Sequence, residues 1–232
     1  LEVSQSMSAG AYERAAVPVI TDLLGKHGFA VLTGGSGLYI DAVVNGFDAL
    51  PAGDPSVRRD LQERFQRDGI EPLLGELRQR DPATGQRIDR HNPQRVIRAL
   101  EVCRTSGRPY STQRSGRRAA RPWQVIKIAM DLPREELYTR IDARVDAMIA
   151  QGLVEEARGL LAARDANALR TVGYRELFAH FDGRLTLEEA IALIKQHTRN
   201  YAKRQLTWLR RDPEWHWRST DQPVIPPTLP GR

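Results

Sequence analysis

The chain has 232 residues, of which 41% are hydrophobic and 28% are charged, so it can form one globular domain or one domain with a substantial insertion. No stretch approaches the roughly 20 apolar residues of a membrane span, and the first residues lack the pattern of a signal peptide. Its one cysteine, Cys103, excludes an internal disulfide and lies in an apolar helical run, which predicts a buried structural thiol. We therefore expect a cytoplasmic protein that does not contact the membrane.

Residues 1–49 predict an α/β arrangement. A helix is expected from Ser8 to about Lys26, with a kink or a shifted boundary at Pro18. The apolar run Phe29–Thr33, bounded by glycines, predicts a buried parallel strand, and the glycine turn after it leads into a second helix. Helix, strand, glycine turn and helix together indicate α/β architecture.

The rest of the chain predicts a helical insertion, a returning strand and a helical C-terminal part. In the insertion, residues 50–122, helices are expected at 55–67, 71–80 and 93–105, before an exposed basic linker at 113–122. A strand is then expected at 123–132, with helices at 135–150, 154–163, 173–181 and 186–210. Prolines in the last twenty residues predict a loose tail, so the core comprises 1–49 and 123–217 and the tail 218–232.

The net charge of +6 is concentrated in two segments. Ten arginines and only two acidic residues lie between Arg87 and Arg121, and six basic residues with no acidic one lie between Lys195 and Arg211. Such clusters are typical of contacts to a nucleic-acid backbone, although a solvated basic surface has the same composition.

Two turns carry residues suited to binding an anionic substrate. The turn Gly34-Gly35-Ser36-Gly37 allows close approach to the backbone and offers a hydroxyl at a helix N-terminus, but a tight turn without a ligand fits as well. It is not a Walker A loop, because no lysine and Ser/Thr pair follows. Arg170 lies where a loop meets a helix and could clamp a phosphate, or it could be an ordinary surface arginine.

Two helices carry basic side chains at regular spacing. Gln94, Arg95 and Arg98 project from the start of a helix that Asn92 caps, where they could contact phosphates and bases or simply face solvent. In the last helix a basic stripe of Lys195, Arg199 and Lys203 is backed by an apolar face, which predicts a helix docked on the core and facing an anionic partner. Trp208, on the apolar face, is expected to pack rather than stack on a base. The five histidines are scattered, and we expect no metal site built from protein ligands alone.

Taken together, six segments resemble the tRNA dimethylallyltransferases, also called tRNA isopentenyltransferases. They occur in the order of that family and span roughly Leu1 to Trp217: Ser8–Tyr12, Gly34–Tyr39, Asn92–Arg95 with Arg98–Glu101, Gly152–Glu156, Val172–Glu176, and Thr198–Gln205 with Thr207–Trp208. The resemblance implies a P-loop-kinase-like α/β core with a helical insertion that grips the anticodon stem-loop of tRNA. It also implies that an adenosine flipped out of that loop attacks dimethylallyl diphosphate with the help of Mg²⁺.

Site residues follow from the resemblance position by position. Arg170 corresponds to an arginine that contacts the diphosphate, and Ser36 stands in the glycine loop of Gly34, Gly35 and Gly37 where the family usually has threonine, close to the adenosine. Contacts to tRNA are implied for Arg58, Gln94, Arg95, Val96, Ile97 and Arg98, and for Leu193, Ile194, Lys195, Gln196, His197 and Thr198.

The family's initial strand, its P-loop and the Asp-Ser segment proposed to supply the base have no counterpart in this sequence. We therefore expect a fragment with little or no activity. Separately, we expect a monomer. Two other functions stay open: a non-catalytic tRNA-binding remnant, and an adenylate isopentenyltransferase acting on free nucleotides. The basic helical insertion argues against the second, because a free nucleotide needs no such platform.

Overall fold

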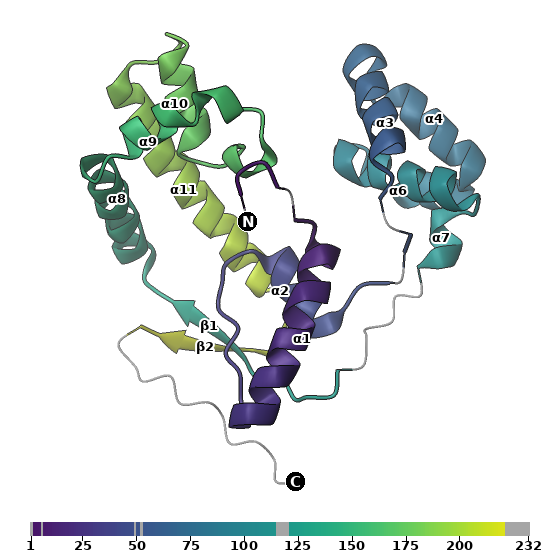
Figure 1. Cartoon of the computed structure of the whole chain (residues 1–232), viewed down its shortest axis with the longest axis horizontal. Helices are drawn as coiled ribbons and strands as arrows, with labels where there is room; N and C mark the ends of the chain where they lie inside the picture. Colours follow the sequence, from purple (N-terminus) through teal and green to yellow (C-terminus); the bar gives the residue numbers. More distant parts are fainter. Residues whose placement is uncertain (1, 6, 49, 52, 115–120, 221–232) are drawn as a thin grey trace. The chain divides into compact units, whose positions relative to one another are not determined.

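The computed structural model describes residues 2–5, 7–48, 50–51, 53–114 and 121–220 and divides the chain into two compact units (Figure 1). Unit 1 comprises Leu1–Val44 and Pro122–Arg232, and unit 2 comprises Asn45–Arg121. Each unit has a hydrophobic core of its own. The assignment of catalysis to one unit and RNA binding to the other stays a prediction.

Unit 1 is mostly helical and contains a small parallel sheet. Its elements are α1 (Ala9–His27), α2 (Gly37–Asn45), β1 (Lys127–Asp131), α8 (Arg134–Ala150), α9 (Leu153–Gly159), the 3₁₀ helices η1 (Leu161–Ala163) and η2 (Asn167–Leu169), α10 (Tyr174–Phe181), α11 (Leu187–Leu209) and β2 (Trp215–Ser219). Its core lies among α8 to α11 and includes Val145, Leu177, Phe178 and Ile194. Thr186 and Glu189 form the predicted capping box at the start of α11.

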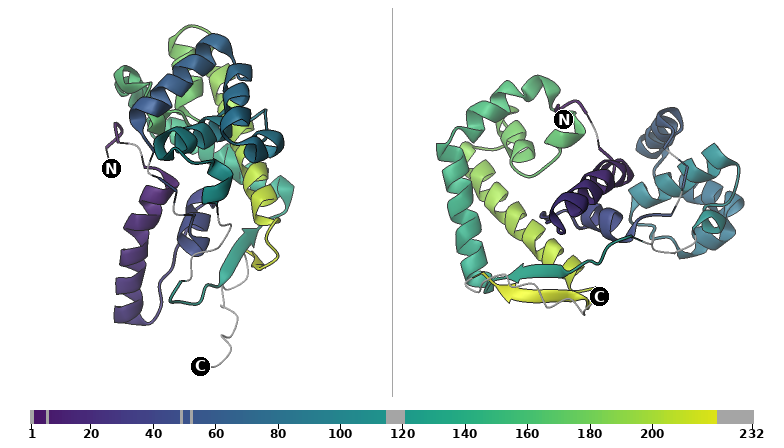
Figure 2. Two further views of the ribbon diagram at one scale, coloured as in Figure 1. Left: turned by 90° about the vertical axis from the view of Figure 1, so that its right-hand side faces the viewer. Right: turned by 60° about the horizontal axis from the view of Figure 1, so that its bottom comes forward.

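The sheet joins two strands that lie far apart in the sequence. β1 and β2 pair in parallel with Lys127 opposite Trp215, and the helices α8 to α11 form the crossover between them (Figure 2). The buried Lys127 ammonium fixes the start of β2, because its Nζ lies 2.6 Å from a carboxylate oxygen of Asp212 and 2.6 Å from one of Glu214. The predicted tail, 218–232, is therefore wrong at Arg218 and Ser219, which belong to β2, and residues 221–232 lie outside the described part.

Two predictions for the N-terminal part are corrected. Phe29–Thr33 forms no strand: no described strand pairs with it, and the side chains of Phe29 and Val31 are 69% and 78% exposed instead of buried. An extended segment becomes a strand only when a neighbour takes up its hydrogen bonds. Of the two outcomes expected at Pro18, the shifted boundary does not occur, because α1 continues through it from Ala9 to His27; the kink stays a prediction.

Unit 2 consists only of helices over its described residues. They are α3 (Pro55–Asp68), α4 (Glu71–Arg80), α5 (Pro82–Arg87), α6 (Pro93–Ser106) and α7 (Tyr110–Gln113). Leucines of α3 and α4 pack with the apolar face of α6, and Cys103 is buried there as predicted. Burial raises the pKa of the Cys103 thiol above its usual range, as expected for an inert structural cysteine. Part of the predicted linker, 115–120, lies outside the described residues.

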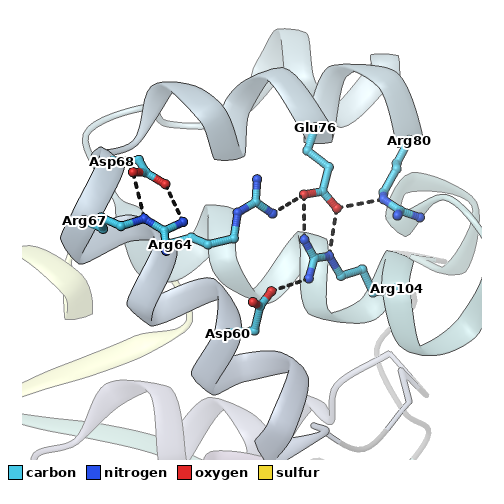
Figure 3. A network of polar contacts seen from close by, with 7 residues as sticks. All are labelled: Asp60, Arg64, Arg67, Asp68, Glu76, Arg80 and Arg104. Carbon is cyan, nitrogen blue, oxygen red and sulfur yellow. Dashed lines mark hydrogen bonds and ion pairs between the residues drawn. The ribbon is translucent and has the colours of Figure 1, made fainter.

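A carboxylate surrounded by three arginines ties the helices of unit 2 together (Figure 3). Arg104 of α6 donates from Nε and Nη2 to the two oxygens of Glu76, each at 2.7 Å, and Arg64 and Arg80 donate to the same carboxylate at 2.7 and 2.9 Å. The hydrogen bonds from Arg104, followed by those from Arg64 and Arg80, lower the pKa of Glu76 to about 2 against the opposing effect of burial. Arg104 also binds Asp60, so α3, α4 and α6 share one network.

In the part of the chain that the structure describes, no helix is long and apolar enough to cross a membrane.

Candidate functional site

Arg170 is presented to solvent by a loop that is fixed on both sides. Leu169, at the end of η2, is buried in the core of unit 1, and Val172 packs against the same core. The Arg170 side chain between them is exposed, and the structure gives it no hydrogen bond or ion pair to any described residue. An exposed guanidinium on a fixed loop is free to bind an anion from outside the chain.

Glu176 holds the end of this loop. Gly173 adopts a φ of 105°, which favours glycine, and its backbone N–H donates to Oε2 of the buried Glu176 at 2.8 Å. The other oxygen, Oε1, lies 2.6 Å from Nδ1 of His197 on α11. Next to Gly173, Tyr174 donates to Glu156 of α9, and this hydrogen bond raises the pKa of Tyr174 to about 12.

The glycine loop before α2 packs directly against the C-terminal part of α11. The Gly35 carbonyl accepts a hydrogen bond from Nε2 of Gln205 at 2.7 Å, and a Cβ on Gly37 would lie 2.5 Å from the ring of Trp208. Neither glycine has a positive φ, so the loop needs glycine for close contact with a helix and not for backbone strain. Ser36 lies between them with its side chain exposed. Trp208 packs as predicted, here on Gly37 and edge-on to Trp215.

Replacing Gly37 by alanine should destabilise unit 1 by about 1–3 kcal/mol, because the added methyl group would overlap the Trp208 ring. All four tryptophans lie in unit 1, so urea unfolding followed by tryptophan fluorescence reports on this unit. Gly34→Ala is the matched control, since a Cβ there would meet nothing within 4 Å. Equal stabilities for the two variants would contradict the packing described above.

Two of the three bases in the predicted stripe of α11 do not face outward, whereas the third, Lys203, is exposed. Arg199 and Lys195 lie against acidic residues of α8, with 2.5 Å between Arg199 Nη1 and Asp142 and 2.7 Å between Lys195 Nζ and Asp146. Arg199 also lies over the ring of Tyr138, 5.9 Å from its centroid. These charges join two helices of unit 1 (Figure 2), so the stripe is mainly an internal contact.

The six residues predicted on α11 to contact RNA point in different directions, because six consecutive residues cover every face of a helix. Ile194 is buried in the core, which corrects its assignment as a side-chain contact to RNA. Lys195 is paired with Asp146, His197 lies on Glu176, and the Thr198 hydroxyl donates to a carbonyl of its own helix. Leu193 is half-buried, and only Gln196 of the six is fully exposed.

In unit 2, too, some of the side chains predicted to contact RNA are buried or paired within the chain, and others are exposed to solvent. Val96 and Ile97 are 0% and 1% exposed in the core, so their side chains cannot reach an RNA, which corrects those two assignments. Arg98 donates to Glu101 and to the carbonyl of Pro51, so it fixes the entry to α3.

The remaining predicted residues of unit 2 stay accessible. Gln94 and Arg95 are exposed on the first turn of α6, and their side chains have no hydrogen bond or ion pair to a described residue. Arg58 is 43% exposed and lies 3.9 Å from the buried Glu101. Exposed Arg87 and Arg90 shortly precede α6 and were not among the predicted contacts, although both lie in the basic segment. This arginine-rich end of α6 is the candidate nucleic-acid surface of unit 2.

The sequence segments singled out above that lie in unit 1 contact one another. The Tyr12 ring packs edge-on to that of Tyr39, at 5.4 Å between centroids, so the first segment contacts the second. The glycine loop meets Gln205 and Trp208 of the last segment, and the segment at Gly152–Glu156 supplies the partner of Tyr174. Site selection by residue type missed Glu156, Glu176, Gln205 and Gly173, which hold the two loops in place.

No group of three or more His, Cys, Asp or Glu side chains arranged to hold a metal ion occurs among the described residues.

Comparison with known proteins gives consistent results. The family model described as IPP transferase matches residues 1–212. A tRNA dimethylallyltransferase of Cytophaga hutchinsonii is 45% identical over 217 residues, which cover 94% of this chain and 71% of that protein. One from Christiangramia forsetii is 45% identical over 222 residues, which cover 96% and 74%.

Solved structures show the same fold. The tRNA isopentenylpyrophosphate transferase of Bacillus halodurans matches with a TM-score of 0.62 and 34% identity, over 94% of this chain and 69% of that one. A eukaryotic dimethylallyltransferase acting on tRNA matches with a TM-score of 0.72, over 94% of this chain and 58% of that one, and at 20% identity it supports the fold alone. These likenesses confirm the expected α/β class with a helical insertion. From the family model and the identities to its relatives, the chain belongs to the IPP transferase family of prenyltransferases.

Proposed function

We propose that this chain transfers a dimethylallyl group from dimethylallyl diphosphate to the N6 amine of the adenosine at tRNA position 37, beside the anticodon. The relatives at 45% identity carry the name tRNA dimethylallyltransferase. The observation that carries the proposal is the exposed Arg170, fixed between two core-packed residues and without a carboxylate partner among the described residues. Such a group suits the diphosphate of an allylic substrate.

In this reaction the amine attacks the allylic carbon, the bond from that carbon to the diphosphate oxygen breaks so that diphosphate leaves with the electron pair, and the amine loses a proton to solvent. Negative charge grows on the departing diphosphate, where the Arg170 guanidinium would stabilise it. The exposed Ser36 hydroxyl would hydrogen-bond to the adenosine. Mg²⁺ belongs to this proposal only as a companion of the substrate, since diphosphate oxygens are ligands it prefers.

Unit 2 is proposed to bind the RNA backbone through Arg95, Gln94 and Arg58. Replacing Arg95 by alanine should weaken binding of an anticodon stem-loop and reduce the slope of log affinity against log salt by about one. The measurement is fluorescence anisotropy at several salt concentrations. Arg67→Ala on α3 is the control, because its guanidinium is already paired with Asp68 at 2.9 Å. An unchanged slope for Arg95→Ala would remove this arginine from the interface.

The function is tested with labelled dimethylallyl diphosphate, Mg²⁺ and an unmodified anticodon stem-loop that has adenosine at position 37. Label on that adenosine supports the proposal, and the same stem-loop with guanosine there should stay unlabelled. The assay is run on this chain and on the chain joined to whatever residues precede the matched region in the C. hutchinsonii relative. Transfer by neither would contradict the proposal. Transfer to free AMP in preference to RNA would favour an adenylate isopentenyltransferase, and RNA binding without transfer would favour a non-catalytic remnant.

A further inference from the structure

Glu176 is a buried carboxylate between two parts of unit 1. Its side chain is 4% exposed, and the structure gives it no lysine or arginine partner among the described residues. Oε2 accepts from the backbone of Gly173 at 2.8 Å, and Oε1 lies 2.6 Å from Nδ1 of His197. A buried carboxylate with so few partners depends on each of them, because an unpaired oxygen in the core is costly.

The Gly173 amide closes the loop that carries Arg170. From Arg170 the backbone runs through Thr171 and Val172 to Gly173, and the Thr171 carbonyl accepts from the amide of Arg175. Gly173 has a φ of 105°, which restricts the backbone conformation at the end of the loop. The amide of this glycine is held by its hydrogen bond to Glu176. A change in the position of that carboxylate would therefore be passed to the loop.

We propose that His197 is a positioning residue for Arg170, acting through Glu176 and the Gly173 amide, and not a contact to RNA. Its Nδ1 edge is directed at the buried carboxylate, and it fixes one oxygen so that the other can hold the loop. The inference rests on the proposed function only in taking a diphosphate as the ligand of Arg170.

α11 would then support both loops of the candidate site. His197 contacts Glu176, which holds the Arg170 loop. Gln205 donates to the Gly35 carbonyl in the loop that carries Ser36. Eight residues of helix separate the two contacts by about 12 Å along the axis. The same helix would thus set the spacing between the arginine and the serine.

The test measures the affinity of this chain for inorganic pyrophosphate by titration calorimetry, in parallel with its affinity for the anticodon stem-loop. His197→Leu should weaken pyrophosphate binding about tenfold, the effect of losing a hydrogen bond to a charged group, and leave RNA affinity unchanged. His197→Asn should restore binding to within about threefold of the parent, because its amide nitrogen can replace Nδ1. His27→Leu, which replaces an exposed histidine at the end of α1, is the matched control and should change neither affinity.

A double-mutant cycle separates positioning from general stability. With Arg170→Gln already present, His197→Leu should cause no further loss of pyrophosphate affinity, since it acts through the missing guanidinium. A further loss of the same size, an RNA affinity that falls instead, or a parent that binds no pyrophosphate would each overturn the inference. Pyrophosphate binding with the expected cycle but no prenyl transfer would count against the proposed function alone. Transfer with normal pyrophosphate binding by the His197→Leu variant would count against this inference alone.

Discussion

Replacing Arg170 by glutamine is expected to lower the rate of prenyl transfer by about 10²–10³-fold, because one fixed donor to the leaving group would be lost. Glutamine is shorter than arginine but stays polar and can still donate a hydrogen bond, and it removes the charge that opposes the growing charge on the diphosphate. RNA affinity should not change. The measurement is a single-turnover transfer assay at saturating stem-loop, on whichever form of the chain is active.

Arg175→Gln is the matched control for that experiment. Arg175 is also exposed, lies in the first turn of α10, and its side chain has no ion pair among the described residues. If a positive charge anywhere in this region were enough to stabilise the diphosphate, the two substitutions would lower the transfer rate equally. A loss confined to Arg170→Gln would instead reflect the fixed position of one guanidinium, whereas equal losses would argue against a specific role for Arg170.

Replacing Glu76 by glutamine is expected to lower the free energy of unfolding of unit 2 by about 3 kcal/mol at neutral pH, because it leaves three arginines without their shared carboxylate. The loss can be followed by pulse labelling of the single cysteine, because Cys103 is buried in unit 2 and reacts only when this unit opens. Urea midpoints from labelling then compare the variant with the parent. Glu63→Gln, which removes an exposed carboxylate without a hydrogen bond or ion pair to a described residue, is the control and should shift the midpoint little.

The same carboxylate predicts a dependence on pH. Because its pKa falls from 4.5 to about 2 on folding, the stability it contributes is fully present above about pH 4.5 and is lost as the pH falls toward 2. The difference between the parent and Glu76→Gln should therefore shrink over that range. A disulfide reagent that reacts in acid allows Cys103 labelling to be used throughout. A difference that stays constant down to pH 2 would mean that the arginines do not hold the carboxylate ionised.

The helices could be predicted from the sequence because their signals are local. Asp54 and Asn92 cap helices followed by proline, and Thr186 with Glu189 starts α11 as expected. Strands depend on partners that the local sequence does not contain. Phe29–Thr33 has the composition of a strand and is not one, whereas β2, which was not predicted and whose last two residues were expected in the tail, pairs with β1.

The candidate site could be predicted in part, because residue types show what can bind but not which side of a helix is free. The bases of α11 lie four residues apart at Lys195 and Arg199, and so do Asp146 and Asp142 on α8, which together satisfy them. This match of spacings was a usable signal in the sequence. The role of Glu176 gave no such signal, because a glutamate near a helix start is common and its burial depends on the whole core.

The parallel pairing of β1 with β2 has a consequence for the synthesis of the protein. β1 leaves the ribosome before α8 to α11, and its partner is the last described element to be made. At a synthesis rate of about 5–20 residues per second, the time between the synthesis of β1 and that of β2 is on the order of ten seconds. Throughout that time β1 lacks the described strand that pairs with it and Lys127 lacks Asp212 and Glu214, so the nascent chain carries an open strand edge until β2 has left the ribosome.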